Sequence, residues 1–104
     1  MIIYSVAVTI DIAIECEWLD WMRQVHVPEV IRSGCFKKAI IYRLVEPESN
    51  GATYVIQYRC SSLQEYHRYR DGFAPALQKK HSDRFHGRFR ASRQLLEEVC
   101  AGEA

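Results

Sequence analysis

Two kinds of hydrophobic periodicity alternate along this 104-residue chain, and their order limits the folds that it can adopt. Four segments alternate apolar and mixed residues with the period of two that is typical of a β-strand: residues 2–10, 36–45, 52–60 and 87–96. Two other segments, residues 15–32 and 62–85, place apolar residues at helical spacing. The order β-α-β-β-α-β predicts an α+β, ferredoxin-like fold, in which both helices cover one face of a four-stranded antiparallel sheet.

Each predicted helix contains a proline, Pro28 in the first and Pro75 in the second. Proline has no N–H for the helical hydrogen bond and disfavours helical geometry at the preceding residue, so each helix must kink or restart there. A kink can turn His26 toward the space between helix and sheet, where an imidazole serves as acid, base or hydrogen-bond donor. The alternative is that His26 is a packed residue of the apolar stripe. The sequence leaves both interpretations open.

The second face of the sheet is also apolar. On the predicted alternation it carries Ile3, Ala7, Ala39, Ile41, Val45, Val55 and Leu96. A continuous apolar patch of this kind is unfavourable in water, and a second sheet packed against it would cover it. We therefore expect a homodimer in which two four-stranded sheets meet face to face.

Composition places the chain in the globular class, with 48% hydrophobic and 26% charged residues. We expect a single domain over residues 1–100 and a disordered tail over residues 101–104. A net charge of +1 gives no general attraction to nucleic acid or to a membrane. The apolar N-terminus has no basic segment and is too short to span a bilayer, and the four cysteines include no Cys-x-x-Cys pair. These features favour a cytoplasmic protein with reduced thiols.

Several motifs together resemble one known family. They are Trp18-Leu19-x-Trp21-Met22, His26-Val27-Pro28-Glu29-Val30, Gly34-Cys35-Phe36, Thr53-Tyr54-x-x-Gln57-Tyr58, and Ala74-Pro75-Ala76-Leu77 with His81, Arg84 and Phe85. The chain is similar over nearly its whole length to the domain of unknown function 4286 family. The resemblance implies a dimeric α+β barrel, a superfamily that includes antibiotic-biosynthesis monooxygenases, haem-degrading oxygenases and small isomerases. Phe73 departs from the family pattern, which often has histidine there, so no role of such a histidine carries over.

We expect the cleft between the sheet and the kinked helices to bind a small apolar or aromatic molecule. The predicted lining residues are Tyr4, Trp21, Met22, His26, Tyr42, Tyr58 and Phe73. Ligand sites are mostly apolar with a few polar groups, and this set has that character.

Two other functions remain open. The resemblance implies that, if the protein is an enzyme, it is a cofactor-independent monooxygenase or isomerase with His26 or His81 as the group that transfers a proton. The third possibility is an interaction module without a ligand. We expect no cofactor and no metal site, because no pair of His or Cys residues has the spacing of a structural zinc site. RNA-recognition domains share the β-α-β-β-α-β order, but their Lys/Arg-Gly-aromatic signature is missing, so core packing better explains the tyrosines of residues 52–60.

Overall fold

The computed structural model describes residues 1–46 and 50–104 and has the predicted order of strands and helices. The strands are β1 (Ile2–Ile10), β2 (Lys38–Arg43), β3 (Ala52–Cys60) and β4 (Phe89–Glu97). The helices are α1 (Glu15–Trp21), α2 (Val27–Arg32), α3 (Leu63–Gly72) and α4 (Ala74–Arg84), with a 3-10 turn, η1 (Ile12–Ile14), and a π-helical turn, η2 (Met22–His26). Pro47 and the Asn50-Gly51 pair predict a turn over residues 46–51 between β2 and β3, and residues 47–49 of this segment lie outside the described residues.

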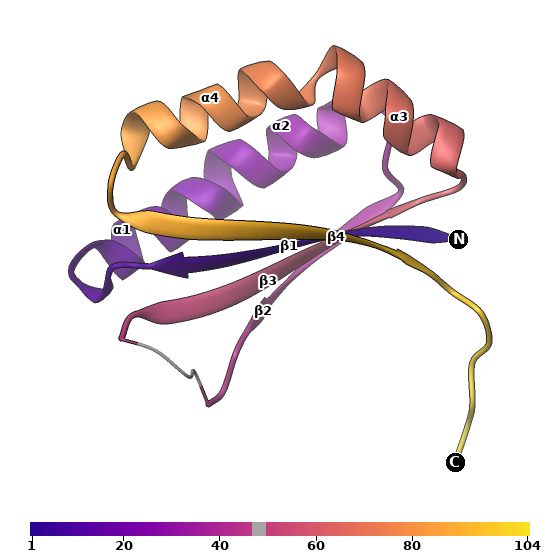
Figure 1. Ribbon diagram of the computed structural model, residues 1–104, viewed down its shortest axis with the longest axis horizontal. Coiled ribbons are helices and arrows are strands. Elements are labelled where there is room, and N and C mark those ends of the chain that lie inside the picture. The colour runs from indigo at the N-terminus through magenta and orange to yellow at the C-terminus, as the bar shows by residue number, and fades with distance from the viewer. Residues whose placement is uncertain (47–49) are drawn as a thin grey trace.

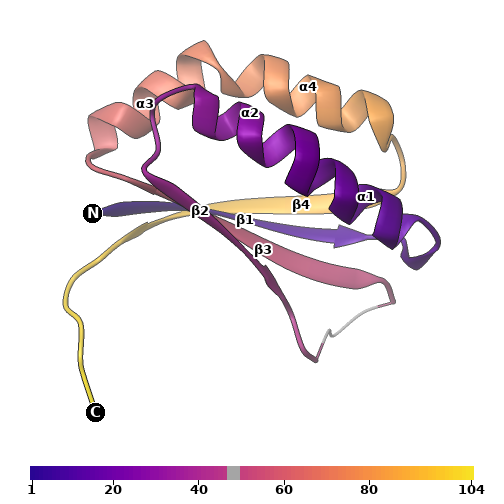
Figure 2. The ribbon, with the colours of Figure 1, turned by 180° about the vertical axis from the view of Figure 1, so that it is seen from behind.

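The four strands form one antiparallel sheet in the order β2-β3-β1-β4. The helices cover one face of this sheet, with α1 and α2 alongside α3 and α4 (Figure 1). The view from behind in Figure 2 shows the same two layers. The predicted α+β, ferredoxin-like fold is confirmed.

Aromatic side chains fill the core between the two layers. Tyr4 of β1 lies at the centre of this packing, with ring centroids 5.8 Å from Tyr58, 6.1 Å from Phe36 and 5.8 Å from Tyr69. Pairs of this kind contribute about 1 kcal/mol beyond the burial of their area. Tyr4 pairs with Tyr58 across the two strands, and both side chains are buried. The even-numbered residues of β1 and β3 therefore face the helices, as the alternation predicted.

The strand β2 differs from its prediction in both length and orientation. It begins at Lys38 and not at Phe36, because the backbone at Lys37 is irregular. The alternation of side chains from Phe36 therefore does not continue into the strand. Phe36 still packs in the core, but Ile41 pairs with the buried Ile56 and so faces the helices. The prediction that Ala39 and Ile41 lie on the second face is therefore wrong. Ile40 and Tyr42 occupy that face instead.

The first helix passes Pro28 without ending. The amide of Val27 donates to the carbonyl of Met22, a π-helical hydrogen bond that spans one residue more than an α-helical bond. This wider turn accommodates Pro28, the second residue of α2, which has no N–H to donate to the preceding turn. The predicted interruption thus takes the form of a π-helical turn that contains His26.

The second helical segment has a true break. Phe73, with φ −126° and ψ −39°, separates α3 from α4, and Pro75 occupies the first turn of α4. The α3 helix begins with Ser62, whose side chain accepts a hydrogen bond from the amide of Glu65, as the sequence Ser-x-x-Glu indicates. Glu65 does not complete the capping box, because its carboxylate pairs with Arg68 at 2.9 Å.

The other face of the sheet has no described helix over it (Figure 1). Its apolar members are Ile3, Ala7, Ile40, Tyr42, Val55 and Leu96. Tyr42 is 46% exposed and Leu96 is 40% exposed. This face is thus apolar at its centre and open, as the sequence predicted, although β2 contributes different residues. None of the helices within residues 1–46 and 50–104 has the length and apolar character of a membrane-spanning segment.

Candidate functional site

A cavity lies between the sheet and the helices, beside the aromatic core. The strands contribute Tyr4, Val6, Val8, Ile56, Tyr58 and Phe89, and the helical layer contributes Met22, His26, Tyr69, Gln78 and His81. Its remaining lining residues, Ser82, Ala91 and Arg93, are exposed, which places the mouth of the cavity between α4 and β4. The site therefore sits under the helical layer and opens at the β4 edge.

The cavity is narrow inside. It contains about 490 Å³ of space between atoms when its solvent-open part is included, but only about 40 Å³ is wide enough for a water molecule. A cavity needs about 10–15 Å³ of such space to hold one water molecule, so the wide part has room for only a few of them. Side chains at the mouth would have to move for a larger molecule to enter.

His81 has one of its two ring nitrogens occupied. The indole Nε1 of Trp18 donates a 2.9 Å hydrogen bond to Nε2 of His81, and both side chains are buried. The His81 ring also packs against Phe89, with centroids 4.4 Å apart. Burial lowers the pKa of His81 to about 4, and the nearby His26 and Arg93 act in the same direction. His81 is therefore a neutral imidazole near pH 7.

His26 comes from the π-helical turn and approaches His81, with ring centroids 5.8 Å apart. Its ring stacks on Trp21 at 5.3 Å. Burial lowers the pKa of His26 to about 4; Glu29, which pairs with Lys80 at 2.8 Å, opposes this shift. The site thus holds two neutral imidazoles in contact.

Arg93 brings a positive charge to the cavity. Its Nε donates a 3.1 Å hydrogen bond to the hydroxyl of Tyr4. Burial raises the pKa of Tyr4, and Arg93 opposes this shift. Burial likewise raises the pKa of Tyr58 and of Tyr69, so the phenols stay protonated near pH 7.

The structure brings together most of the residues that the sequence indicated. Tyr4, Met22, His26 and Tyr58 line the cavity, and so does His81, the second proton-transfer candidate. Trp21 lies directly behind them, against both imidazoles.

Tyr42 and Phe73 do not belong to this group. Tyr42 pairs with Val55 on the open face of the sheet, so its predicted place in the cleft is wrong. Phe73 lies at the junction of α3 and α4, where it lines a separate shallow groove with Glu29 and Leu77. It packs partly buried against the edge of the core and does not line the cavity, so its predicted place in the same cleft is also wrong.

Sequence reasoning missed Arg93, Tyr69 and Gln78. Arg93 carried the clearest signal, because it is a charged residue on the same face of its strand as Phe89, Ala91 and Leu95. A cation on an otherwise apolar face indicates either a partner or a ligand.

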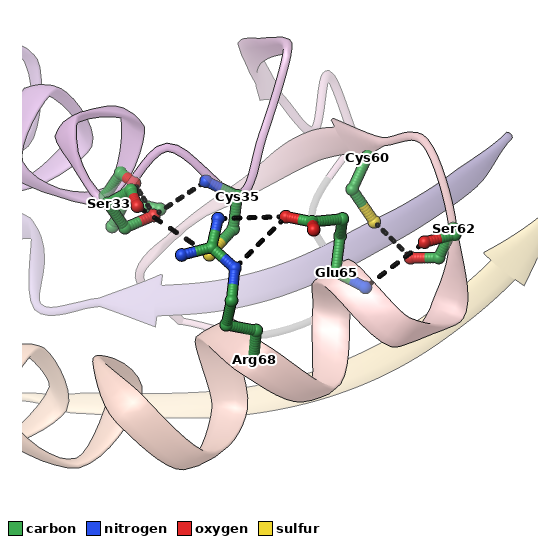
Figure 3. A network of polar contacts seen from close by, with 7 residues as sticks. Ser33, Cys35, Cys60, Ser62, Glu65 and Arg68 are labelled. Carbon is green, nitrogen blue, oxygen red and sulfur yellow. Dashed lines mark hydrogen bonds and ion pairs between the residues drawn. The ribbon is translucent and has the colours of Figure 1, made fainter.

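A second polar group lies at the far end of the helical layer (Figure 3). The thiol of Cys60 donates to the carbonyl of Ser62 at 3.5 Å, and the amide of Cys35 donates to the hydroxyl of Ser33 at 3.3 Å. Cys35 and Cys60 are buried free thiols, whereas Cys16 and Cys100 are exposed. Within residues 1–46 and 50–104, no three His, Cys, Asp or Glu side chains are arranged to hold a metal ion.

Three solved structures that share this fold are distant from this chain in sequence. HapK from Hahella chejuensis is 12% identical, with a TM-score of 0.74 over 100% of this chain and 98% of that one. An EthD-family protein from Bacillus halodurans is 13% identical, with a TM-score of 0.67 over 95% and 100% of the two chains. A variant of SnoaB, a cofactor-independent oxygenase from Streptomyces nogalater, is 15% identical, with a TM-score of 0.64 over 92% and 90%. At these identities the likeness establishes the fold alone.

No curated protein matches the chain in sequence. A family model does match it, over residues 1–99, and this agrees with the resemblance carried by the tryptophan, histidine and proline motifs. The chain belongs to the family described as a domain of unknown function, DUF4286.

Proposed function

We propose that this protein binds a small aromatic molecule in the cavity between sheet and helices, and that it does so as a homodimer. The observation that carries the proposal is a pair of neutral imidazoles, His26 and His81, on a cavity walled by aromatic rings. Ligand sites typically combine an apolar wall with a few convergent polar groups, and this cavity has that composition.

The ring nitrogens supply the polar contacts. Within the described residues, neither nitrogen of His26 has a hydrogen-bond partner, and only Nε2 of His81 has one. No fully buried side-chain nitrogen or oxygen of the described residues lacks a partner. The unpartnered nitrogens therefore touch solvent-accessible space, and the cavity is the space that both residues line. A bound molecule could satisfy them.

The size of the cavity sets a condition on this proposal. A benzene ring does not fit the wide part of about 40 Å³. Entry requires the long side chains at the mouth to move, and Arg93 is the main obstacle because it crosses from β4 to the hydroxyl of Tyr4. Arg93 is exposed, and its 3.1 Å hydrogen bond to Tyr4 contributes about 1 kcal/mol, so moving this side chain aside costs little free energy.

A second candidate function is cofactor-independent oxygenation or isomerisation, in which His26 or His81 transfers a proton. SnoaB, an oxygenase, shares the fold, and the paired imidazoles are a possible acid and base. A pKa of about 4 makes each ring a weak base at neutral pH, because efficient general bases have pKa values near the working pH. The geometry therefore supports binding more strongly than proton transfer.

The homodimer would use the open face of the sheet. Val55 lies at the centre of this face, between Ala7 of β1 and Tyr42 of β2. We expect Val55→Glu to convert a dimer into a monomer, because a buried carboxylate at the centre of a sheet-to-sheet interface is strongly unfavourable. Leu63→Glu, at an exposed apolar residue of α3, is the matched control and should leave the mass unchanged. Light scattering after size-exclusion chromatography measures both, and a monomeric parent protein would contradict this part of the proposal.

Native mass spectrometry of the freshly purified protein tests ligand binding first, because it reports subunit number and any retained molecule together. NMR titration with phenol then provides a defined probe, and we expect chemical-shift changes concentrated at His26 and His81. Ala91→Phe should abolish these changes, since Ala91 lines the mouth. Ala13→Phe, an equal enlargement at an exposed residue of η1, should not. No saturable shift at either histidine would refute the proposal.

A further inference from the structure

We infer that Trp18 is a positioning residue that fixes the tautomer of His81, so that the cavity presents an N–H donor and selects aromatic ligands bearing an acceptor oxygen. This inference rests on the proposed function, and it names the class of ligand: aromatic carbonyl compounds are preferred over hydrocarbons of the same shape.

The tautomer follows from the chemistry of the two side chains. The indole nitrogen of Trp18 is a donor only, and it lies 2.9 Å from Nε2 of His81. The Nε2 atom must therefore act as the acceptor. A neutral imidazole carries one proton, so in His81 that proton is on Nδ1.

The donor on Nδ1 is available to a ligand. This nitrogen has no hydrogen-bond partner in the described part of the chain, and His81 lines the cavity with 8% of its surface exposed. A fully buried, unpartnered nitrogen is excluded for the described residues. The Nδ1 atom therefore has accessible surface, and we assign this surface to the cavity that His81 lines.

The position of Trp18 makes this arrangement rigid. Trp18 is 0% exposed, and its ring packs against Tyr54 of β3 with centroids 5.1 Å apart. It does not line the cavity, so it acts only through His81. A buried indole held by helix and sheet cannot swing away to release Nε2 without disturbing the core.

The charge near the site favours the same class of ligand. Arg93 lines the cavity with His81, and its positive charge influences both imidazoles and the hydroxyl of Tyr4. A carbonyl oxygen carries partial negative charge, which this field stabilises. A hydrocarbon that displaced water from Nδ1–H would leave a donor unpaired, which is unfavourable.

Acetophenone and α-methylstyrene test the inference, because they have nearly the same shape and differ in a carbonyl oxygen against a methylene group. We expect the protein to bind acetophenone about tenfold more tightly, the ratio that one net hydrogen bond provides. Trp18→Phe should reduce acetophenone affinity about tenfold and leave α-methylstyrene affinity unchanged. Phe85→Leu is the packing control, since Phe85 contacts the His81 ring at 5.4 Å without a hydrogen bond and lies outside the cavity lining.

A second measurement needs no variant at Trp18. Two-bond ¹H–¹⁵N correlation spectra of the parent protein distinguish the protonated from the unprotonated ring nitrogen, and His81→Gln identifies the signals. Protonated Nδ1 supports the inference, and protonated Nε2 overturns it even if Trp18→Phe does not fold. Equal affinity for the two probes overturns the inference while the proposed function stands. If neither probe binds the parent protein, both fail.

Discussion

His26 and His81 come from different helices, and their rings meet edge to face with centroids 5.8 Å apart. Each ring has a pKa of about 4 in the folded protein against 6.5 for an ordinary histidine. Between pH 6.5 and 4 the unfolded chain therefore binds more protons than the folded protein, and the free energy of unfolding falls as the pH is lowered through this range. One such histidine accounts for about 3 kcal/mol. Urea unfolding at pH 7.5, 5.5 and 4.5 measures the decrease.

The double variant His26→Gln/His81→Gln should lose most of this pH dependence. His86→Gln, at an exposed histidine beyond α4, serves as the control and should retain it. The same slope in the double variant and in the parent protein would show that other groups cause the pH dependence.

A hydrogen bond from Tyr54 joins the sheet to the first helix. Its hydroxyl donates to Oε2 of Glu15 at 2.6 Å and accepts from Nε of Arg43 at 3.2 Å. We expect Tyr54→Phe to lower the free energy of unfolding by about 1 kcal/mol, because the phenyl ring keeps the packing and loses only the polar contacts. Urea titration at pH 7.5 provides the value, with Tyr66→Phe, on α3 and away from the open face, as the control. An unchanged midpoint for Tyr54→Phe would mean that water replaces the hydroxyl without cost.

Gly51 occupies a backbone conformation that other residues rarely adopt. Its φ is +115°, and an added Cβ would lie 2.9 Å from the carbonyl oxygen of Ile10. We expect Gly51→Ala to destabilise the protein by about 2 kcal/mol, from backbone strain together with the clash. Gly72→Ala is the matched control, because Gly72 ends α3 with no atom within 4 Å of an added Cβ. It should be neutral or stabilising. Thermal unfolding compares the two, and equal midpoints would contradict the prediction.

The four cysteines should divide into two reactivity classes. Cys16 and Cys100 are exposed, whereas Cys35 is 3% and Cys60 is 0% exposed. Burial also raises the pKa of the Cys60 thiol, which lowers its thiolate fraction. We expect two thiols to react rapidly with Ellman's reagent and two to react only on unfolding. Cys16→Ser/Cys100→Ser should remove the rapid phase, and a third rapid thiol in the parent protein would contradict the prediction.

The fold could be predicted because three of the four strands keep strict alternation. In β1, the side chains of Tyr4 and Val8 face the core as their spacing requires. The exception, β2, follows an irregular residue at Lys37, and a single break in a period of two reverses every later side chain. No local signal distinguished Ala39 and Ile41 from Ile40 and Tyr42, because both sets are apolar.

The residues of the candidate site that strands contribute could be predicted from the sequence. The contacts between different helices could not. Tyr4 and Tyr58 followed from alternation alone. The hydrogen bond from Trp18 to His81 joins residues far apart in the chain, and only the packing of α1 against α4 creates it. Phe73 was misplaced because a helix break reorients the residue at which it occurs.

The π-helical turn at Met22–His26 has a geometric consequence for the whole first helical segment. Each residue of an α-helix turns the chain by 100°. In one continuous α-helix, the side of the helix that faces β3 at Trp18 would therefore determine which residues beyond Val27 face β2. The extra residue in the π-helical turn shifts the side of α2 that faces the sheet by about 100° relative to a continuous α-helix. With this offset α1 faces β3 through Trp18 while α2 faces β2 at the edge of the sheet, and His26 lies at the joint between the two helices.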